Sequence, residues 1–151
     1  MYYRVADPAV YHLWATVQGV GERRLAEVDR LVATYLSDRG SLETVSRPEL
    51  SRRLAEGHTV VLDVRPALEY RQGHIVSARS LPVDALEARL GELDPAQEIV
   101  AYCRGRYCVY ADDAVRLLRA RGFSAVRYDE GYPAWAAAGG PVAREDLPVS
   151  A

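Results

Sequence analysis

Hydrophobic positions divide the chain into two differently patterned parts. In residues 8–37 the apolar side chains follow a mixed three and four spacing, which predicts one face of a single long helix. Asp7 can cap this helix and Pro8 suits its first turn, whereas Gly19 and Gly21 each weaken its middle by about 1 kcal/mol relative to alanine. The apolar positions are Val10, Leu13, Trp14, Val17, Val20, Leu25, Val28, Leu31, Val32 and Tyr35.

A helix over residues 8–37 would be roughly 45 Å long, which is more than a small domain can cover. We therefore expect its apolar stripe to meet a second copy of the chain, so that the protein is a homodimer through this helix. The alternative is that the helix folds back on the rest of the chain. Acidic and basic residues balance along it, so no stripe for nucleic acid is expected.

After a short linker at residues 37–41, predicted strands alternate with predicted helices. This order predicts an α/β fold, in which a parallel sheet has helices on both faces. We divide the chain into residues 1–40, a helix and linker, and residues 41–151, the α/β domain. The strands are expected at 42–45, 59–64, 77–81, 98–103 and 124–129. The helices are expected at 65–73, 83–93, 112–122 and 131–139. A further helix is expected to begin at the capping box formed by Ser46 and Glu49.

Composition narrows the possible functions. The 151 residues carry a net charge of −2, and all 19 basic residues are arginine, because the sequence contains no lysine. Schiff-base catalysis and Walker-type phosphate loops both need lysine, so neither is expected. The three histidines are scattered and predict no metal site. We expect a cytoplasmic protein without a membrane span. Thiols stay reduced in the cytoplasm, so the two cysteines favour catalysis or sensing over a structural bridge.

The segment "YCRGRYCVY" places Cys103 at the end of a predicted strand. Ligands of open parallel sheets bind at this edge. The helix that follows offers unpaired N–H donors and partial positive charge, and Arg104 and Arg106 add full charge, so we predict a lowered pKa and a reactive thiolate at Cys103. Gly105 permits a sharp turn. The alternative is that Cys103 and Cys108 are small buried residues; Cys108 is equally compatible with helix-start packing and with a resolving thiol.

Together with this loop, two further segments resemble the rhodanese domain over about residues 42–142. They are "VVLDVRPALEYRQGHIVSARSLP" and "GYPAWAAAGGPV". The resemblance implies a five-stranded parallel sheet and a sulfurtransferase that needs no cofactor. In such an enzyme Cys103 would take a sulfane sulfur from a small anionic donor such as thiosulfate, or from a persulfide. It would then pass this sulfur to a thiol or other thiophilic acceptor. The backbone N–H groups of the loop would cradle the terminal sulfur. The loop residues are Arg104, Gly105, Arg106, Tyr107, Cys108 and Val109.

The loop also departs from the family pattern. Many family loops have glycine as the third residue after the cysteine, whereas here glycine is second and the fifth residue is Cys108. Such a thiol could attack the persulfide and form a disulfide. Residues 2–36 resemble the last wing strand and dimerisation helix of an ArsR-type regulator, but the helix-turn-helix is not in this sequence, so nucleic acid binding by this chain alone is not expected. The second interpretation is therefore a persulfide or redox sensor that uses Cys103 and Cys108.

Other polar residues have weaker claims to a role. Asp63 and Arg65 lie at a strand end and could line the pocket mouth, although an ion pair between Arg65 and Glu69 is the favoured interpretation. His74 is expected to hold a loop through a backbone hydrogen bond, because an ionised thiol needs no general base. Tyr107 could shape the entrance, and Trp135 is expected in the core.

Overall fold

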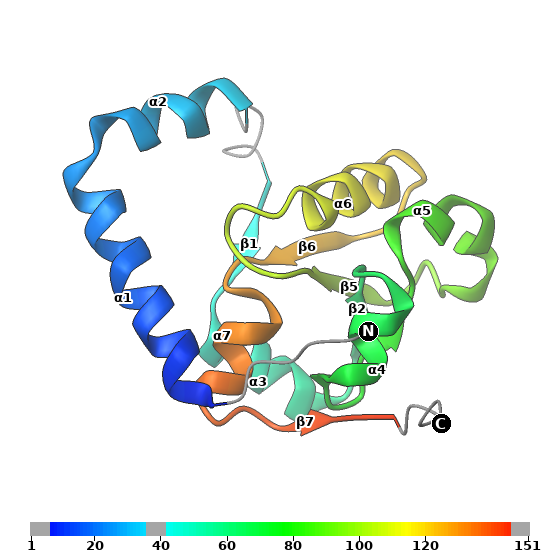
Figure 1. Cartoon of the computed structure of the whole chain (residues 1–151). Coiled ribbons are helices and arrows are strands. Elements are labelled where there is room, and N and C mark those ends of the chain that lie inside the picture. The colour runs from blue at the N-terminus through cyan, green and yellow to red at the C-terminus, as the bar shows by residue number, and fades with distance from the viewer. Residues whose placement is uncertain (1–6, 36–41, 146–151) are drawn as a thin grey trace, which may run out of the picture. The chain divides into compact units, whose positions relative to one another are not determined.

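Five parallel strands form the central sheet of the larger of two units in the computed structural model (Figure 1), which describes residues 7–35 and 42–145. The units are residues 1–41 and 42–151. The sheet order is β1-β6-β5-β2-β4, which makes β5 the central strand. The strands are β1 (Thr44–Val45), β2 (Thr59–Asp63), β4 (Arg79–Ser80), β5 (Glu98–Tyr102) and β6 (Ala125–Tyr128).

Helices cover both faces of this sheet, as the sequence predicts. On one face lie α5 (Val83–Leu86), the 3-10 helix η2 (Glu87–Glu92) and α6 (Tyr110–Ala120). On the other face lie α3 (Arg47–Glu56), α4 (Ala67–Gln72) and α7 (Gly131–Ala137). The predicted α/β class is thereby confirmed.

Alternation along the strands builds the two cores. Ile99 and Ala101 of β5 point toward α6, whereas Val100 and Tyr102 point toward α3 and α7. Such a strand, apolar on both faces, is expected where helices cover both sides of a parallel sheet. Tyr102 pairs in register with Asp63 of β2 and with Tyr128 of β6, so the carboxyl ends of the three central strands meet at one edge.

A small antiparallel pair, which the sequence pattern does not predict, joins the middle of the domain to its end. β3 (His74–Ile75) pairs with β7 (Val142–Ala143). Two-residue strands carry too few side chains to give a periodic pattern.

The N-terminal unit contains the predicted long helix but corrects its extent. Residues 8–37 do not form a single helix: α1 (Pro8–Arg24) ends at Leu25, whose backbone is extended, and α2 (Ala26–Tyr35) leaves at an angle (Figure 1). The amide of Leu25 makes the last bond of α1, to the Gly21 carbonyl, so the chain breaks one turn after the second of the two weakening glycines. At 17 residues, α1 is roughly 26 Å long.

Two helix starts agree with the sequence. The Asp7 carboxylate accepts from the Ala9 amide at 2.7 Å, and the Ser46 hydroxyl accepts from the Glu49 amide at 3.4 Å. Residues 36 and 37, where the predicted helix ends, lie outside the described ranges. Within those ranges, no helix is long and apolar enough to cross a membrane.

Candidate active site

The thiol loop, residues 103–109, connects the end of the central strand β5 to the start of α6. Cys103 directly follows the strand and is 1% exposed. Val109 is the residue before α6 and has no side-chain hydrogen bond to its first turn. The N-terminus of this 11-residue helix, which has no side-chain cap at Val109, therefore faces the same sheet edge as Cys103, and its partial positive charge favours negative charge there.

The two cysteines of the loop are bonded to each other. Their Cα atoms are 6.3 Å apart, within the range that a disulfide spans. The Cys108 amide donates to the Gly105 carbonyl at 3.0 Å, which closes a tight turn between the cysteines. Gly105 has φ +144°, a conformation that favours glycine. In this bonded form the Cys108 amide is used inside the loop, so the cradle of amides from Arg104 to Val109 stays a prediction for the reduced form.

The start of α7 fixes the thiol loop through backbone contacts. The Tyr132 amide donates to the Cys103 carbonyl at 3.0 Å. Gly131 has φ +72°, and a β-carbon there would lie 2.4 Å from the Gly105 nitrogen. Only glycine permits this approach of two backbones, so the Gly-Tyr-Pro segment of α7 fixes the path of the chain after Cys103.

Both loop arginines have acidic partners. Arg104 reaches across to α4, where its Nε lies 3.1 Å from Glu69 Oε2, and its guanidinium lies 5.1 Å from the centre of the Tyr110 ring. The hydrogen bond with Glu69 raises the pKa of Arg104, which stays charged. Arg106 lies 3.7 Å from Asp129 at the end of β6. One further contact joins Arg104 Nη1 to Cys108 Sγ at 4.0 Å.

The comparisons with known proteins agree with this geometry. The family model for the rhodanese-like domain matches residues 46–138, which include the whole thiol loop. The chain belongs to the rhodanese-like domain family. A protein of Allochromatium vinosum named "Sulfurtransferase" is 33% identical over 100 residues, which are 65% of this chain and 92% of that protein.

A second relative extends the similarity to the N-terminal unit. It is "HTH-type transcriptional regulator Rv0324" of Mycobacterium tuberculosis, 46% identical over 149 residues, which are 98% of this chain. The chain spans 64% of the length of that regulator. Among solved structures, a protein from Lactobacillus plantarum matches with a TM-score of 0.62 at 30% identity, over 77% of this chain and 96% of that one.

Asp63 and Arg65 form a buried pair inside the rhodanese-like domain. They are 0% and 4% exposed, and Arg65 Nε lies 2.9 Å from Asp63 Oδ1. The Arg65 guanidinium also donates to the Gly73 carbonyl at 2.7 Å, and the Tyr102 hydroxyl donates to Asp63 at 2.7 Å. Burial, reinforced by the Asp63 carboxylate, raises the pKa of Tyr102, so the phenol keeps its proton.

The predicted ion pair of Arg65 with Glu69 is present, but the contacts show that Arg65 has a closer partner. The main partner of Arg65 is Asp63, and Glu69, the partner that helical spacing favours, lies 4.0 Å away. Because both side chains are buried and their polar atoms bind each other and the loop at Gly73, the contacts do not support a role at the pocket mouth.

A second buried ion pair lies on the other side of β5. Arg127 of β6 is 4% exposed, and its guanidinium lies 2.7 Å from Asp112 in the first turn of α6 and 2.8 Å from Asp129. Asp112 would oppose a thiolate at the helix N-terminus, but Arg127 neutralises it. Sequence reasoning missed Arg127; the available signal was an arginine among the apolar residues of a buried strand, which needs a charged partner.

Three expectations about flanking residues have clear outcomes. His74 Nδ1 donates to the Tyr70 carbonyl at 2.8 Å, which confirms the expected backbone hydrogen bond. Trp135 is 1% exposed and packs edge-to-face against Tyr128, which confirms its place in the core. Tyr107 is 40% exposed beside the bonded cysteines, and its role at the entrance stays a prediction.

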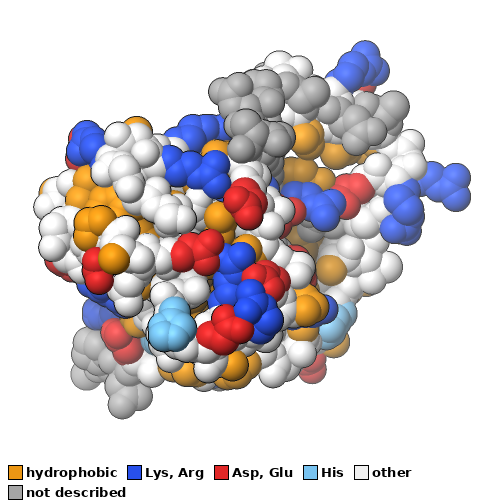
Figure 2. Space-filling view, turned by 180° about the vertical axis from the view of Figure 1, so that it is seen from behind, with side chains coloured by type: hydrophobic (Ala, Val, Ile, Leu, Met, Phe, Trp, Pro, Cys, Tyr) orange, Lys and Arg blue, Asp and Glu red, His pale blue; other side chains and the backbone are white. Residues whose placement is uncertain are grey.

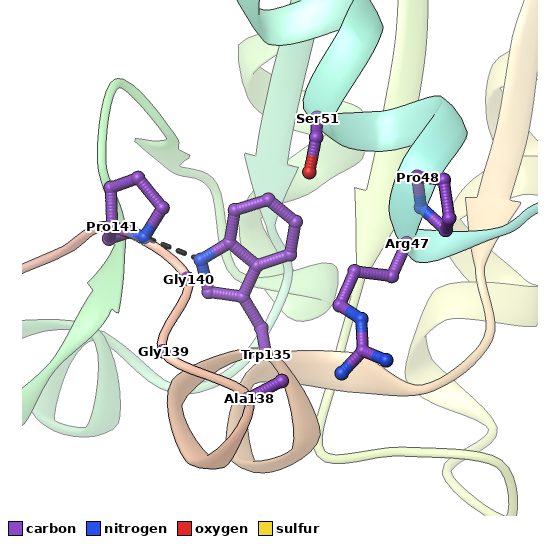
Figure 3. A pocket seen from close by; sticks show the side chains of 8 residues that line it. All are labelled: Arg47, Pro48, Ser51, Trp135, Ala138, Gly139, Gly140 and Pro141. Carbon is purple, nitrogen blue, oxygen red and sulfur yellow. Dashed lines mark hydrogen bonds between the residues drawn. The ribbon is translucent and has the colours of Figure 1, made fainter.

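An open groove of about 380 Å³ lies between α3 and the segment after α7 (Figure 3). The Trp135 indole forms its floor and donates to the Pro141 carbonyl at 3.0 Å, and no residue of the thiol loop lines it. The described residues contain no cluster of three or more metal-ligating side chains. On the face seen in Figure 2, acidic and basic side chains are intermixed and form no broad patch of one charge.

Proposed function

We propose that the chain is a sulfurtransferase that moves a sulfane sulfur through a persulfide on Cys103. The observation that carries the proposal is the position of Cys103 in a rhodanese-like domain, at the carboxyl end of the central strand and before the N-terminus of α6. The relative named "Sulfurtransferase" supports the same class of reaction.

The reaction has two steps. The Cys103 thiolate attacks the outer sulfur of thiosulfate or of a persulfide, the sulfur–sulfur bond of the donor breaks, and sulfite or a thiolate leaves. The acceptor, a thiol or cyanide, then takes the outer sulfur and returns Cys103 as a thiolate. Covalent capture divides one difficult transfer into two simpler steps.

Local electrostatics favour the anionic intermediates. The helix N-terminus supplies partial positive charge, whereas the charge of Arg104 is largely balanced by Glu69. Because Cys103 is 1% exposed, the helix N-terminus acts on its sulfur where little water competes. Tyr107 and Val109, 40% and 42% exposed, would form the rim that a donor meets first.

Sulfur loading needs the reduced loop, because the bond to Cys108 removes the nucleophile. We therefore propose a cytoplasmic setting, where thiols are kept reduced. The test uses reduced protein with thiosulfate and cyanide, and measures thiocyanate. We expect turnover by the wild type, none by Cys103→Ser, and turnover by Cys108→Ser. Equal turnover by Cys103→Ser and the wild type would overturn the assignment of Cys103.

A second function is favoured by one observation, the 46% identity to a transcriptional regulator over 98% of the chain. In that case Cys103 and Cys108 act as a persulfide or redox sensor, and the N-terminal unit joins two copies. The apolar stripe of α1 supports a homodimer, because its members are largely exposed: Val10 52%, Leu13 68%, Trp14 61%, Val17 57% and Val20 47%.

The two functions make different demands on the loop. A sensor forms the Cys103–Cys108 bond when treated with polysulfide and shows no turnover of thiosulfate. An enzyme loses turnover while the bond persists and regains it on reduction. Intact mass and thiocyanate production, measured on the same sample, separate the two.

A further inference from the structure

We propose that the thiol loop has a second activity, in which Cys108 converts the Cys103 persulfide into sulfide. This persulfide reductase activity rests on the proposed function, because it begins with the loaded Cys103. It differs from sulfur transfer in its product: sulfur leaves as sulfide instead of passing to an acceptor. The main evidence is that Cys103 and Cys108 are bonded to each other within the loop.

The loop is built to bring the two cysteines together. Their Cα atoms are 6.3 Å apart. The turn closed by the Cys108 amide and the Gly105 carbonyl holds this spacing, and the Tyr132 amide fixes the carbonyl of Cys103. Within a separation of about 7 Å a disulfide can form without backbone movement. Cys108 therefore needs no large rearrangement to attack Cys103.

Arg104 is placed to activate Cys108. Its Nη1 lies 4.0 Å from Cys108 Sγ, and Glu69 holds the other side of the guanidinium. The Tyr110 ring, 5.1 Å from Arg104 Cζ, further restricts it. A fixed positive charge beside a thiol favours the thiolate, which is the attacking species in exchange.

The step balances as a thiol–disulfide exchange. The Cys108 thiolate attacks Sγ of the Cys103 persulfide, the bond between that atom and the outer sulfur breaks, and the outer sulfur leaves with the electron pair as hydrosulfide. The product is the Cys103–Cys108 disulfide. The sulfane sulfur is reduced, and the two cysteine sulfurs are oxidised.

A dithiol reductant, such as a thioredoxin-type protein, completes the cycle. In the bonded form Cys103 is 1% exposed, whereas Cys108 is only partly buried, so the reductant attacks Cys108. Cys103 then leaves as a thiolate, ready for the next donor. Over one cycle a persulfide and a dithiol give a thiol, hydrogen sulfide and an oxidised dithiol.

The experiment is a single turnover with reduced protein, without oxygen, acceptor or reductant, using glutathione persulfide and, in parallel, thiosulfate as probes. For the wild type we expect one equivalent of sulfide per chain and a final mass lower by two hydrogen atoms. Cys108→Ser should keep one added sulfur atom and release no sulfide. Cys103→Ser is the control that should neither gain sulfur nor release sulfide.

The outcomes separate this inference from the proposed function. If Cys108→Ser takes up one sulfur and the wild type also keeps it without releasing sulfide, the reductase activity is refuted and sulfur transfer stands. If Cys108→Ser takes up sulfur from neither probe, both fail. Sulfide release by Cys108→Ser at the wild-type rate would also refute the role of Cys108.

Discussion

Replacing Gly131 by alanine tests the backbone contact on which the thiol loop depends. Gly131 has φ +72°, and a β-carbon there would lie 2.4 Å from the Gly105 nitrogen and 2.6 Å from the Cys103 carbonyl oxygen. The neighbouring atoms are backbone and cannot move aside as a flexible side chain can. Alanine at this position must displace the loop from α7.

The cost has two parts. A left-handed conformation costs an L-residue about 1–2 kcal/mol relative to glycine. The overlap adds about 1–3 kcal/mol, as is typical of overpacked interiors. We therefore expect Gly131→Ala to lower the free energy of unfolding by about 2–5 kcal/mol.

Gly57 provides a matched control, because its φ is +73° and a β-carbon added there would meet no atom within 4 Å. Gly57→Ala should cost only the conformational part, about 1–2 kcal/mol. Urea denaturation monitored by tryptophan fluorescence gives both values, and alkylation of Cys103 in the reduced proteins shows whether the loop has moved. Equal losses of stability in the two variants, with unchanged alkylation, would refute the argument that Gly131 holds the loop.

Three further changes test other parts of the structure. Asp63→Asn removes the close carboxylate partner of the buried Arg65 and leaves Glu69 at 4.0 Å, and it should lower the free energy of unfolding by about 3–5 kcal/mol in urea denaturation. Trp135→Phe removes the hydrogen bond to the Pro141 carbonyl and part of the floor of the groove, and should cost about 1–3 kcal/mol in the same assay. Leu13→Glu places a charge in the exposed stripe of α1, and should shift the proposed dimer to monomer in sedimentation velocity.

Two controls belong to these changes. Glu92→Gln breaks an exposed pair with Arg89, and should leave the free energy of unfolding close to that of the wild type, because exposed pairs contribute little. A cost similar to that of Asp63→Asn would contradict the importance of burial. His12→Glu adds a charge to α1 away from the stripe and should leave the dimer intact, so dissociation by both variants would refute a seam formed by the stripe.

Local patterns were sufficient to predict the main features of the fold and the position of the thiol. The strand that ends at Tyr102, the glycine turn and the helix after Val109 lie next to one another in sequence, so their order alone places Cys103 at the sheet edge. The sequence also allowed the approach of Cys108 to Cys103 to be predicted, because a loop of this length can bring the two Cα atoms within the range that a disulfide spans.

Partners that are distant in sequence could not be predicted in this way. Arg104 binds Glu69, 35 positions earlier, and Arg127 binds Asp112, 15 positions earlier. Their pairing depends on which strands become neighbours, which spacing does not encode. The break at Leu25 was missed for a different reason: the apolar periodicity continues across it, and the glycine signal was assigned to weakening of the helix instead of to its end.

The charges around the end of β5 explain why the backbone matters so much at this site. Each arginine there has a carboxylate partner: Arg65 with Asp63, Arg104 with Glu69, Arg106 with Asp129, and Arg127 with Asp112 and Asp129. These groups are close to neutral in sum, so net charge contributes little to the stabilisation of an anion at Cys103. What remains is oriented: the N-terminus of α6, whose effect falls off within about one helical turn, and the predicted cradle of loop amides in the reduced form. Stabilisation of a thiolate or persulfide then depends on where the backbone runs. That path is set by Gly105 and Gly131, two positions where the chain has no room for a side chain or adopts a conformation that favours glycine.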